Sequence, residues 1–202
     1  MQSQVLKIPS GYINVVNNPY VGLSGPATAW PPPSDFIGQL GKRVNLPADV
    51  VKYKASVGTV YGGWFRSVRL KLNSAVPVIG QALFWDDTVA ENLYQVTALE
   101  TITTYGAAAF AGVCLSASVT PGNETIIQDE GLCAVHYRAV ISGTTAVGRP
   151  VVLAAAGAGA DNGFFDIDDT PTDPQYLVGY ASALPVAGAL AQIMLRPLNI
   201  RA

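Results

Sequence analysis

The stretch PQYLVGYASALPVAGALAQIMLRP, residues 174 to 197, decides how the rest of the chain is interpreted. Between Pro174 and Arg196 it is mostly apolar over about twenty residues, the length of an α-helix that crosses a bilayer. Within a helix, however, Pro185 would cost roughly 3 kcal/mol and each glycine roughly 1 kcal/mol relative to alanine, whereas both residue types are favoured in turns. We therefore expect a strand, a turn at Pro185 and Gly188, and a second strand.

The chain upstream of this stretch carries the same pattern once more. Aligning Pro77 with Pro150 and Gly112 with Gly179 also brings Gly122 within one residue of Gly188, which indicates an internal repeat. In the first copy the turn VTPGNE (119–124) is polar, so that copy cannot be a membrane helix. By analogy the second copy is predicted to be strands that are covered on both faces or that meet another protein on one face.

Composition indicates a mainly β protein, built from β-sandwich or small β-barrel units with an extended N-terminal arm. Half of the 202 residues are hydrophobic, 13% are charged, and the chain contains 20 Gly and 14 Pro. Such a chain favours short strands joined by turns. The opening MQSQVLKIPSGY lacks a secretory-signal pattern, so we expect no export through a membrane.

Residues 1–48 are predicted to form an extended docking arm. This segment holds half of all prolines, and each proline fixes φ and removes a backbone donor. It is also rich in large apolar side chains, which is atypical of disorder. We infer that the arm docks on its own domain or on a partner.

Two further regions follow the arm. Residues 49–75 are predicted to form a β-hairpin region turning at Gly62-Gly63, because apolar and polar side chains alternate after the turn; the alternative is that the two glycines lie in a loop. Residues 76–202 are predicted to form one β domain made of two related units, 76–142 and 147–202.

Charge is distributed unevenly along the chain. Residues 1–75 hold eight Lys and Arg against two acidic residues, a net charge of +6, and the remainder has a net charge of −8. This split suits head-to-tail contact between copies, or an arm lying on an acidic neighbour, and it also fits ordinary solvated faces of one domain. We expect self-association, with a trimer as one candidate.

The sequence offers little for catalysis, and we expect neither an enzyme nor a bound cofactor or metal. His136 is the single histidine, which excludes sites built on several histidines, and Cys133 falls on the opposite face of the same expected strand. Cys114 and Cys133 are interpreted as buried small residues, with a disulfide as the alternative.

The acidic stretch from Asp161 to Asp173 lacks the order of an EF-hand, so a solvated loop is the first interpretation and a calcium site the second. The Gly-rich AAAGAGADNG (154–163) lacks nucleotide-binding spacing, and an acidic domain disfavours nucleic acid as a partner.

The segments PVVL (150–153), LVGYASA (177–183) and AGALAQIML (187–195) resemble the capsid cement or decoration proteins of tailed bacteriophages. The resemblance is clearest over residues 76–202 and lies in small residues and turns. It implies a structural protein of the virion that is assembled in the host cytoplasm. On the capsid exterior it would bind the major capsid protein, stabilise contacts between capsid subunits, and need no membrane or nucleic-acid partner.

An extended basic arm with spaced aromatic residues fits such a role, because aromatic and arginine side chains dominate binding energy at interfaces. The residues expected to contact a partner are Tyr12, Tyr20, Trp30, Phe36, Lys42, Arg43, Trp64 and Arg66. The alternative function is a phage tail, fibre or baseplate β-protein that binds a host surface glycan through exposed Trp and Tyr. A hydrolytic enzyme on a β-sandwich ranks last, because no pair of acids that would converge in a pocket is evident.

Overall fold

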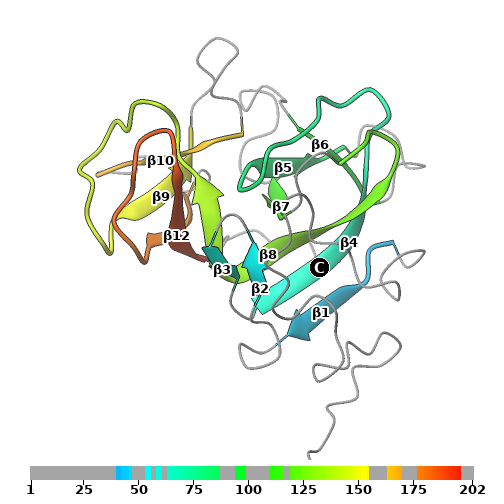
Figure 1. Ribbon diagram of the computed structural model, residues 1–202, viewed down its shortest axis with the longest axis horizontal. Helices are drawn as coiled ribbons and strands as arrows, with labels where there is room; N and C mark the ends of the chain where they lie inside the picture. Colours follow the sequence, from blue (N-terminus) through cyan, green and yellow to red (C-terminus); the bar gives the residue numbers. More distant parts are fainter. Residues whose placement is uncertain are drawn as a thin grey trace, which may run out of the picture.

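A computed structural model describes residues 40–46, 53–55, 58–60, 63–86, 94–98, 110–115, 119–154, 163–169 and 177–196. Every regular element among these residues is a β-strand, so the expected mainly β class is confirmed. The strands form one ten-stranded sheet and one separate two-stranded sheet. Figure 1 shows two lobes, which the long strand β8 joins.

The first lobe is a closed ring of five strands. Around the ring, β4 pairs with β6, β6 with β5, β5 with β7, β7 with β8, and β8 again with β4. All these pairings are antiparallel except the parallel pair of β4 and β6. The strands are β4 (Gly63–Leu70), β5 (Ala82–Trp85), β6 (Gln95–Thr97), β7 (Phe110–Cys114) and the first half of β8 (Glu124–His136).

The second lobe repeats the order of the first when the first ring is followed in the opposite direction, from β4 through β8, β7 and β5 to β6. The second half of β8 pairs with β12, and the order continues through β11 and β9 to β10, all antiparallel. A parallel bridge from Tyr137 to Phe165 then returns β10 to the end of β8 and closes the ring. The strands are β9 (Pro150–Leu153), β10 (Phe165–Ile167), β11 (Leu177–Ala181) and β12 (Leu190–Leu195).

Strand β8 therefore has two roles. It is the last strand of the first ring, and its second half takes the place in the second ring that β4 has in the first. The order of strands thus repeats along the chain, although the first ring begins at Gly63 and the rings share a strand. The sequence units 76–142 and 147–202 remain a prediction, because shared pairing order does not fix unit boundaries.

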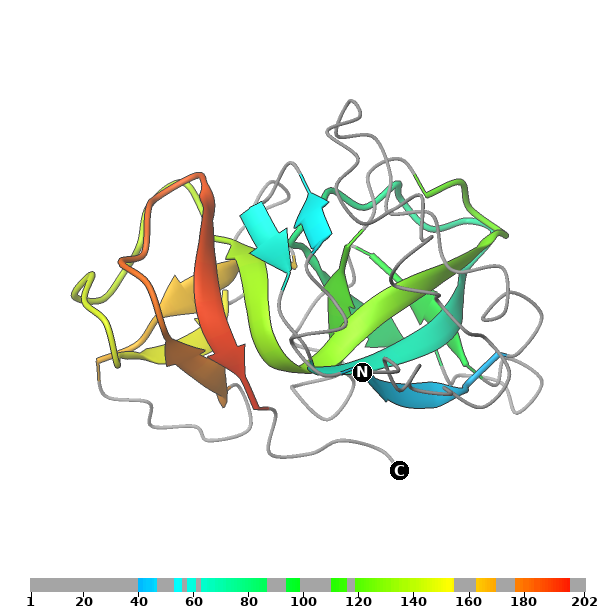
Figure 2. The same cartoon turned by 60° about the horizontal axis from the view of Figure 1, so that its bottom comes forward.

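Two backbone features sit where β8 passes between the rings. The register with β4 shifts between Trp64 and Phe65, so that Asp129 is an extra residue on β8, which is a β-bulge. Two residues later Gly131 has a φ of 109°, which is unfavourable for residues with a Cβ. A bulge and a glycine bend a strand, and Figure 2 shows β8 curving sharply between its two halves.

The stretch that opened the sequence analysis is a strand, a turn and a strand, as expected. The backbone N–H of Ala189 donates to the carbonyl oxygen of Val186 at 3.1 Å, and Gly188 has a φ of 66°. The first ring has the same turn, in which Asn123 donates to Thr120 at 3.0 Å and Gly122 has a φ of 87°. A positive φ at the third residue is typical of a type II turn. No helix in the described ranges is long and apolar enough to cross a membrane.

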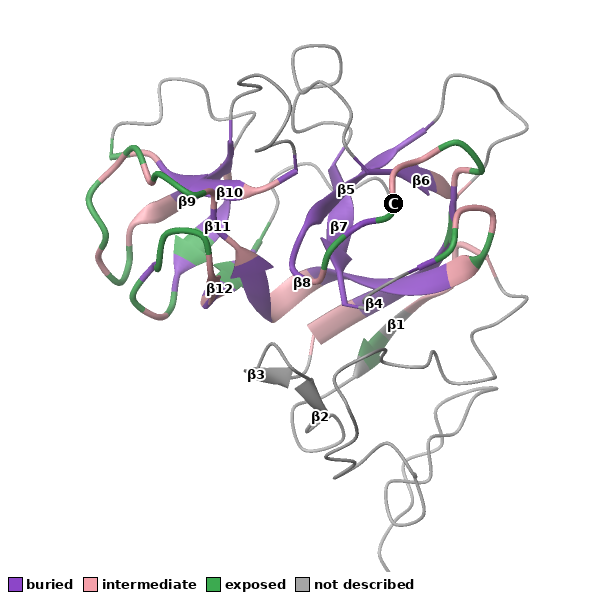
Figure 3. Cartoon of the chain, turned by 45° about the horizontal axis from the view of Figure 1, so that its top comes forward, coloured by how far each residue is buried: buried purple, intermediate pink, exposed green. Residues whose placement is uncertain are grey.

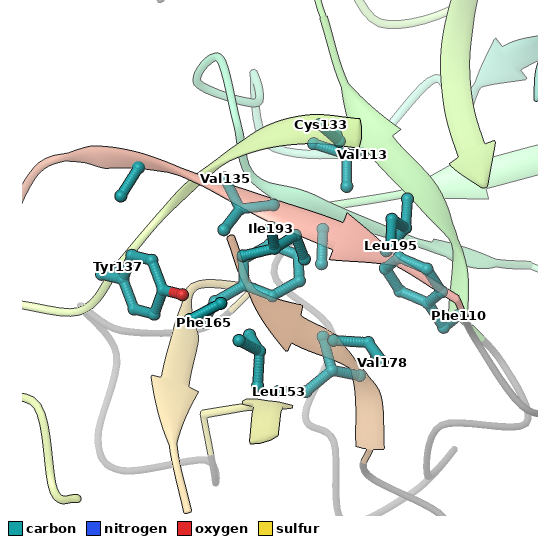
Figure 4. Packing of buried hydrophobic residues seen from close by; sticks show 14 of the residues in the cluster. Phe110, Val113, Cys133, Val135, Tyr137, Leu153, Phe165, Val178, Ile193 and Leu195 are labelled. Carbon is teal, nitrogen blue, oxygen red and sulfur yellow. The ribbon is translucent and has the colours of Figure 1, made fainter. Parts of the chain in front are cut away.

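Two apolar clusters hold the rings together. One fills the first ring with side chains from all five of its strands, including Val68, Leu83 and Val96. The other fills the second ring and extends to residues of β4, β5 and β7. Figure 4 shows Leu153, Phe165 and Val178 converging around Ile193. Because the second cluster contains residues of both rings, the lobes pack as one body.

The region expected to be a hairpin is arranged differently. Strands β2 (Tyr53–Ala55) and β3 (Gly58–Val60) pair with each other. Strand β4 pairs with β1 (Arg43–Leu46), β6 and β8 rather than with β3. The strands on either side of Gly62-Gly63 are thus not partners, because the long β4 satisfies its backbone groups with strands from elsewhere in the chain. Of the expected arm, residues 1–39 lie outside the described residues.

Candidate partner-binding surfaces

The structure describes four of the eight residues expected to contact a partner. Lys42 and Arg43 lie at the start of β1, and Trp64 and Arg66 lie on β4. The other four, Tyr12, Tyr20, Trp30 and Phe36, lie outside the described residues.

Pairing of β1 with β4 brings three of these residues together. Arg43 is directly opposite Arg66, and Asn45 is directly opposite Trp64. The two cross-strand pairs are two residues apart, so Arg43, Arg66 and Trp64 lie on the same face of the sheet. The guanidinium carbon of Arg43 lies 4.4 Å from the centroid of the Trp64 ring, a cation–π contact. A second cation–π contact is made by Arg66, whose guanidinium carbon lies 5.6 Å from the centroid of the Trp85 ring.

Acidic residues at the bulge of β8 complete the cluster. Arg43 donates from Nε to Oδ2 of Asp129 at 2.8 Å and from Nη2 to Oε2 of Glu130 at 3.0 Å. Arg66 donates from Nε to the same Oδ2 at 3.3 Å. The Asp129 side chain is almost fully buried, and so is that of Arg66. Asp129 thus joins β1, β4 and β8.

The pKa values in this cluster reflect competition between burial and pairing. Burial raises the pKa of Asp129, and the hydrogen bonds and charges of Arg43 and Arg66 oppose this without cancelling it. For Arg43, burial lowers the pKa, but the hydrogen bonds and charges of Asp129 and Glu130 outweigh it and the net shift is upward. Arg43 therefore stays charged and bound to its partners.

Arg66 is 4% exposed, which leaves it inside the protein rather than at a contact surface. Lys42, Arg43 and Trp64 are partly exposed. Their contact with a partner remains a prediction, while the geometry gives Arg43 and Arg66 an internal role in fastening β1 to the first ring.

The uneven charge of the sequence is partly balanced within one chain. Among the described residues of the first 75, four basic side chains form ion pairs with acids from beyond residue 75, namely Arg43 with Asp129 and Glu130, Arg66 with Asp129, Arg69 with Glu124, and Lys71 with Asp86. Contact between copies is therefore not needed to explain the charge split, because the basic strand β4 lies against the acidic part of β8.

A second surface, which sequence reasoning did not single out, consists of exposed apolar residues in the loops of both rings. In the second ring, Val140 and Val147 lie between β8 and β9, and Leu184 and Val186 lie between β11 and β12. In the first ring, Leu72 and Val76 lie between β4 and β5. Figure 3 shows exposed residues in these loops, most of them in the loops of the second ring. One signal in the sequence was a large apolar residue next to a turn-forming residue, as in Val147-Gly148 and Leu184-Pro185-Val186.

The outer face of the second ring exposes a smaller apolar pair. Tyr180 of β11 is directly opposite Met194 of β12, and both side chains are nearly half exposed. Strand β12 buries every second residue in the ring, and β11 buries Val178, Gly179 and Ala181 but leaves Tyr180 exposed. The run is therefore not covered on both faces along its whole length, and contact of its exposed face with another protein remains a prediction.

Residues considered for chemistry have structural partners. Asp166 accepts hydrogen bonds from the backbone and hydroxyl of Ser142 and from Arg138, and Asp169 accepts two from Thr144. Asp161 and Asp173 lie outside the described residues. Among those described, no three His, Cys, Asp or Glu side chains gather where they could hold a metal ion.

His136 and the cysteines are likewise part of the fold. The His136 ring stacks on Phe164 with centroids 4.6 Å apart, and its Nδ1 lies 2.9 Å from the carbonyl oxygen of Tyr137. Cys114 and Cys133 are free thiols and buried, as expected. Burial raises the pKa of the Cys133 thiol, which disfavours the reactive thiolate.

Comparison with known proteins gives a likeness in structure but none in sequence. No protein-family model matches the chain, and no curated protein matches it in sequence. Among solved structures, the N base of the head fiber gp8.5 of bacteriophage phi29 is similar, with 18% sequence identity and a TM-score of 0.40. The match covers 65% of this chain and 92% of that chain. A TM-score of this size leaves the surfaces described above as the basis for assigning a function.

Proposed function

We propose that the protein is a structural component of a bacteriophage virion, which binds the outside of the capsid lattice and stabilises contacts between major capsid protein subunits. The observation that carries this proposal is the set of exposed apolar side chains in the loops of the two rings, above all Leu72, Val140 and Leu184. Exposed apolar side chains mark a surface that another protein covers where they gather on adjoining segments, as Val140 and Val186 do on either side of the hydrogen bond from Gly188 to Arg138. The sequence pattern of residues 76–202, which resembles that of capsid cement proteins, supports the major capsid protein as the partner.

The geometry of the body suits this role. Two closed rings share β8 and one apolar cluster, so the loops at both ends are held on a single stiff support. A protein that clamps neighbouring subunits needs contacts on a rigid body, and closed rings have no free sheet edges within them. The Arg43–Asp129–Arg66 cluster additionally fastens β1, and with it the chain that leads to the expected arm.

The direct test is to add the purified protein to capsids of the same virus that were assembled without it. We expect the protein to sediment with these capsids and to raise the temperature at which they break open. A matched incubation with host-cell surface polysaccharide tests the alternative, the glycan-binding tail, fibre or baseplate protein. Binding to polysaccharide together with indifference to capsids would reject the proposal.

A further inference from the structure

Each ring has a turn that is hydrogen-bonded to the chain at the end of a neighbouring strand. In the first ring the turn Thr120–Asn123 lies beside the end of β4, where the N–H of Gly122 donates to the carbonyl of Leu70 at 2.8 Å. In the second ring the turn Val186–Ala189 lies beside the end of β8, where Gly188 donates to Arg138, again at 2.8 Å. Each accepting strand occupies the same place in its ring.

In both rings, the chain that accepts this hydrogen bond carries an exposed apolar side chain at the equivalent position. Two residues after the accepting carbonyl, the first ring has Leu72, which is 72% exposed, and the second has Val140, which is 71% exposed. We call the first tip Leu72 with its turn Thr120–Asn123, and the second tip Val140 with its turn Val186–Ala189. Glycine at the third turn position brings each turn close to the chain that carries the tip residue.

The tips lie far apart along the molecule. The first tip adjoins the start of β8 and the second adjoins its end, and β8 runs through both rings. Figure 1 shows the corresponding loops at opposite ends of the long axis. One body therefore presents the same apolar feature twice, once at each end.

The charges beside each tip are paired within the protein. Near the first tip, Lys71 pairs with Asp86 and Arg69 with Glu124. Near the second, ion pairs join Arg138 to Asp166 and Arg149 to Asp169. A complementary surface consequently needs no charge of either sign, and an uncharged apolar hollow fits both tips.

From this repetition we infer that the two tips bind two subunits of one repeating partner, the major capsid protein, each in an uncharged apolar hollow. The inference rests on the proposed function and adds the contact residues and the bivalent mode. Two projecting tips of the same kind do not interlock, so a second copy of this chain is a poorer occupant. Binding two subunits at once gains from effective concentration, because the second contact becomes intramolecular.

The test measures binding to capsids assembled without the protein, using Leu72→Ser, Val140→Ser and the double variant. We expect each single variant to bind about 100-fold more weakly, because one missing tip removes the bivalent gain. The double variant should lose binding altogether. Val78→Ser is the matched control, since it removes a 45% exposed apolar residue that belongs to neither tip and should bind like the wild type.

Several outcomes are decisive. Wild-type protein that ignores the capsids overturns the proposed function and this inference with it. Wild-type binding that the double variant retains overturns the inference alone, as does a loss caused by Val140→Ser but not by Leu72→Ser. End-to-end chains of wild-type protein that the double variant abolishes would assign the tips to copies of this chain instead. Circular dichroism of each variant confirms that the exposed substitutions leave the fold intact.

Discussion

Asp129 accepts hydrogen bonds from two guanidinium groups at the junction of the rings. We therefore expect its substitution to lower the stability of the fold. Substitution Asp129→Asn keeps the shape of the side chain but leaves Arg43 and Arg66 side by side without their shared negative charge. Removing one partner of a buried ion pair is strongly destabilising. Burial of the carboxylate opposes part of this loss, as its raised pKa shows, and Arg43 is partly exposed, so we expect the free energy of unfolding to fall by about 3 kcal/mol, the low end of that range. Urea denaturation measures it.

Glu124→Gln provides the control for this prediction. Glu124 pairs with Arg69, whose side chain is about half exposed, so the loss should stay below about 1 kcal/mol. Similar small losses for both variants would show that Asp129 does not lock the junction.

Asp169 gives the fold a dependence on acid. Hydrogen bonds from the side chain and backbone of Thr144, helped by the charge of Arg149, lower the pKa of Asp169 below its ordinary value of 3.8. A lowered folded-state pKa contributes stability that is fully present above 3.8 and is lost as pH falls through the folded-state pKa. Asp169→Asn should therefore lose less stability than the wild type between pH 5 and pH 2. Identical pH profiles of the unfolding midpoint would contradict this.

Individual residues were predictable from the sequence where local chemistry determines them. The turns at Gly122 and Gly188 follow from turn-forming residues between apolar runs, and the burial of Cys114 and Cys133 follows from their apolar neighbours. The stacking of Arg43 on Trp64 and its pairing with Asp129 were not predictable. They depend on β1 lying beside β4 and on a bulge 86 residues along the chain, and neither leaves a local pattern.

The equivalence of the two turns makes a prediction for the strand–turn–strand elements. Gly122→Ala and Gly188→Ala each place a Cβ at a positive φ, and each should cost about 1 to 2 kcal/mol. The two losses should agree closely, because each turn closes the same place in its ring. Gly188→Asn should cost less, since asparagine tolerates this conformation. A loss at only one turn, measured by urea denaturation, would contradict the equivalence.

At the scale of elements, the apolar pattern predicted the type of structure better than the pairing. The segments around Gly122 and Gly188 were predicted as strand, turn and strand, and the structure agrees. The hairpin at Gly62-Gly63 was expected because alternation and two glycines fit one, but alternation does not say which strand is the partner. Strand β4 finds its partners in β1, β6 and β8 instead.

Sharing of β8 predicts that the whole molecule unfolds as one unit. Ile193 is fully buried in the second ring, whereas Trp64 and Trp85 lie in the first. Ile193→Ala should cost about 3 kcal/mol by leaving a cavity, and the loss should reach both rings. In a Trp30→Phe background, tryptophan fluorescence and circular dichroism should then report the same lowered unfolding midpoint. A fluorescence transition that stays at the wild-type midpoint would show that the rings unfold independently.

The architecture of the whole molecule was only partly contained in the sequence. The repeat in residues 76–202 indicated that one arrangement occurs twice, but not that the rings would share a strand. The charge split suggested contact between copies, whereas pairs such as Arg66 with Asp129 join the two charged regions within one chain. Long-range pairing of this kind arises from the closure of the rings, which no local sequence signal records.

The most direct test of the account is an image of the assembled particle. Cryo-electron microscopy of capsids reconstituted with the protein should show the long axis of each molecule spanning two capsid subunits, with Leu72 against one and Val140 against the other. Density in which the molecule contacts the particle through the side of one ring, or in which no density is added to the capsid exterior, would contradict the account.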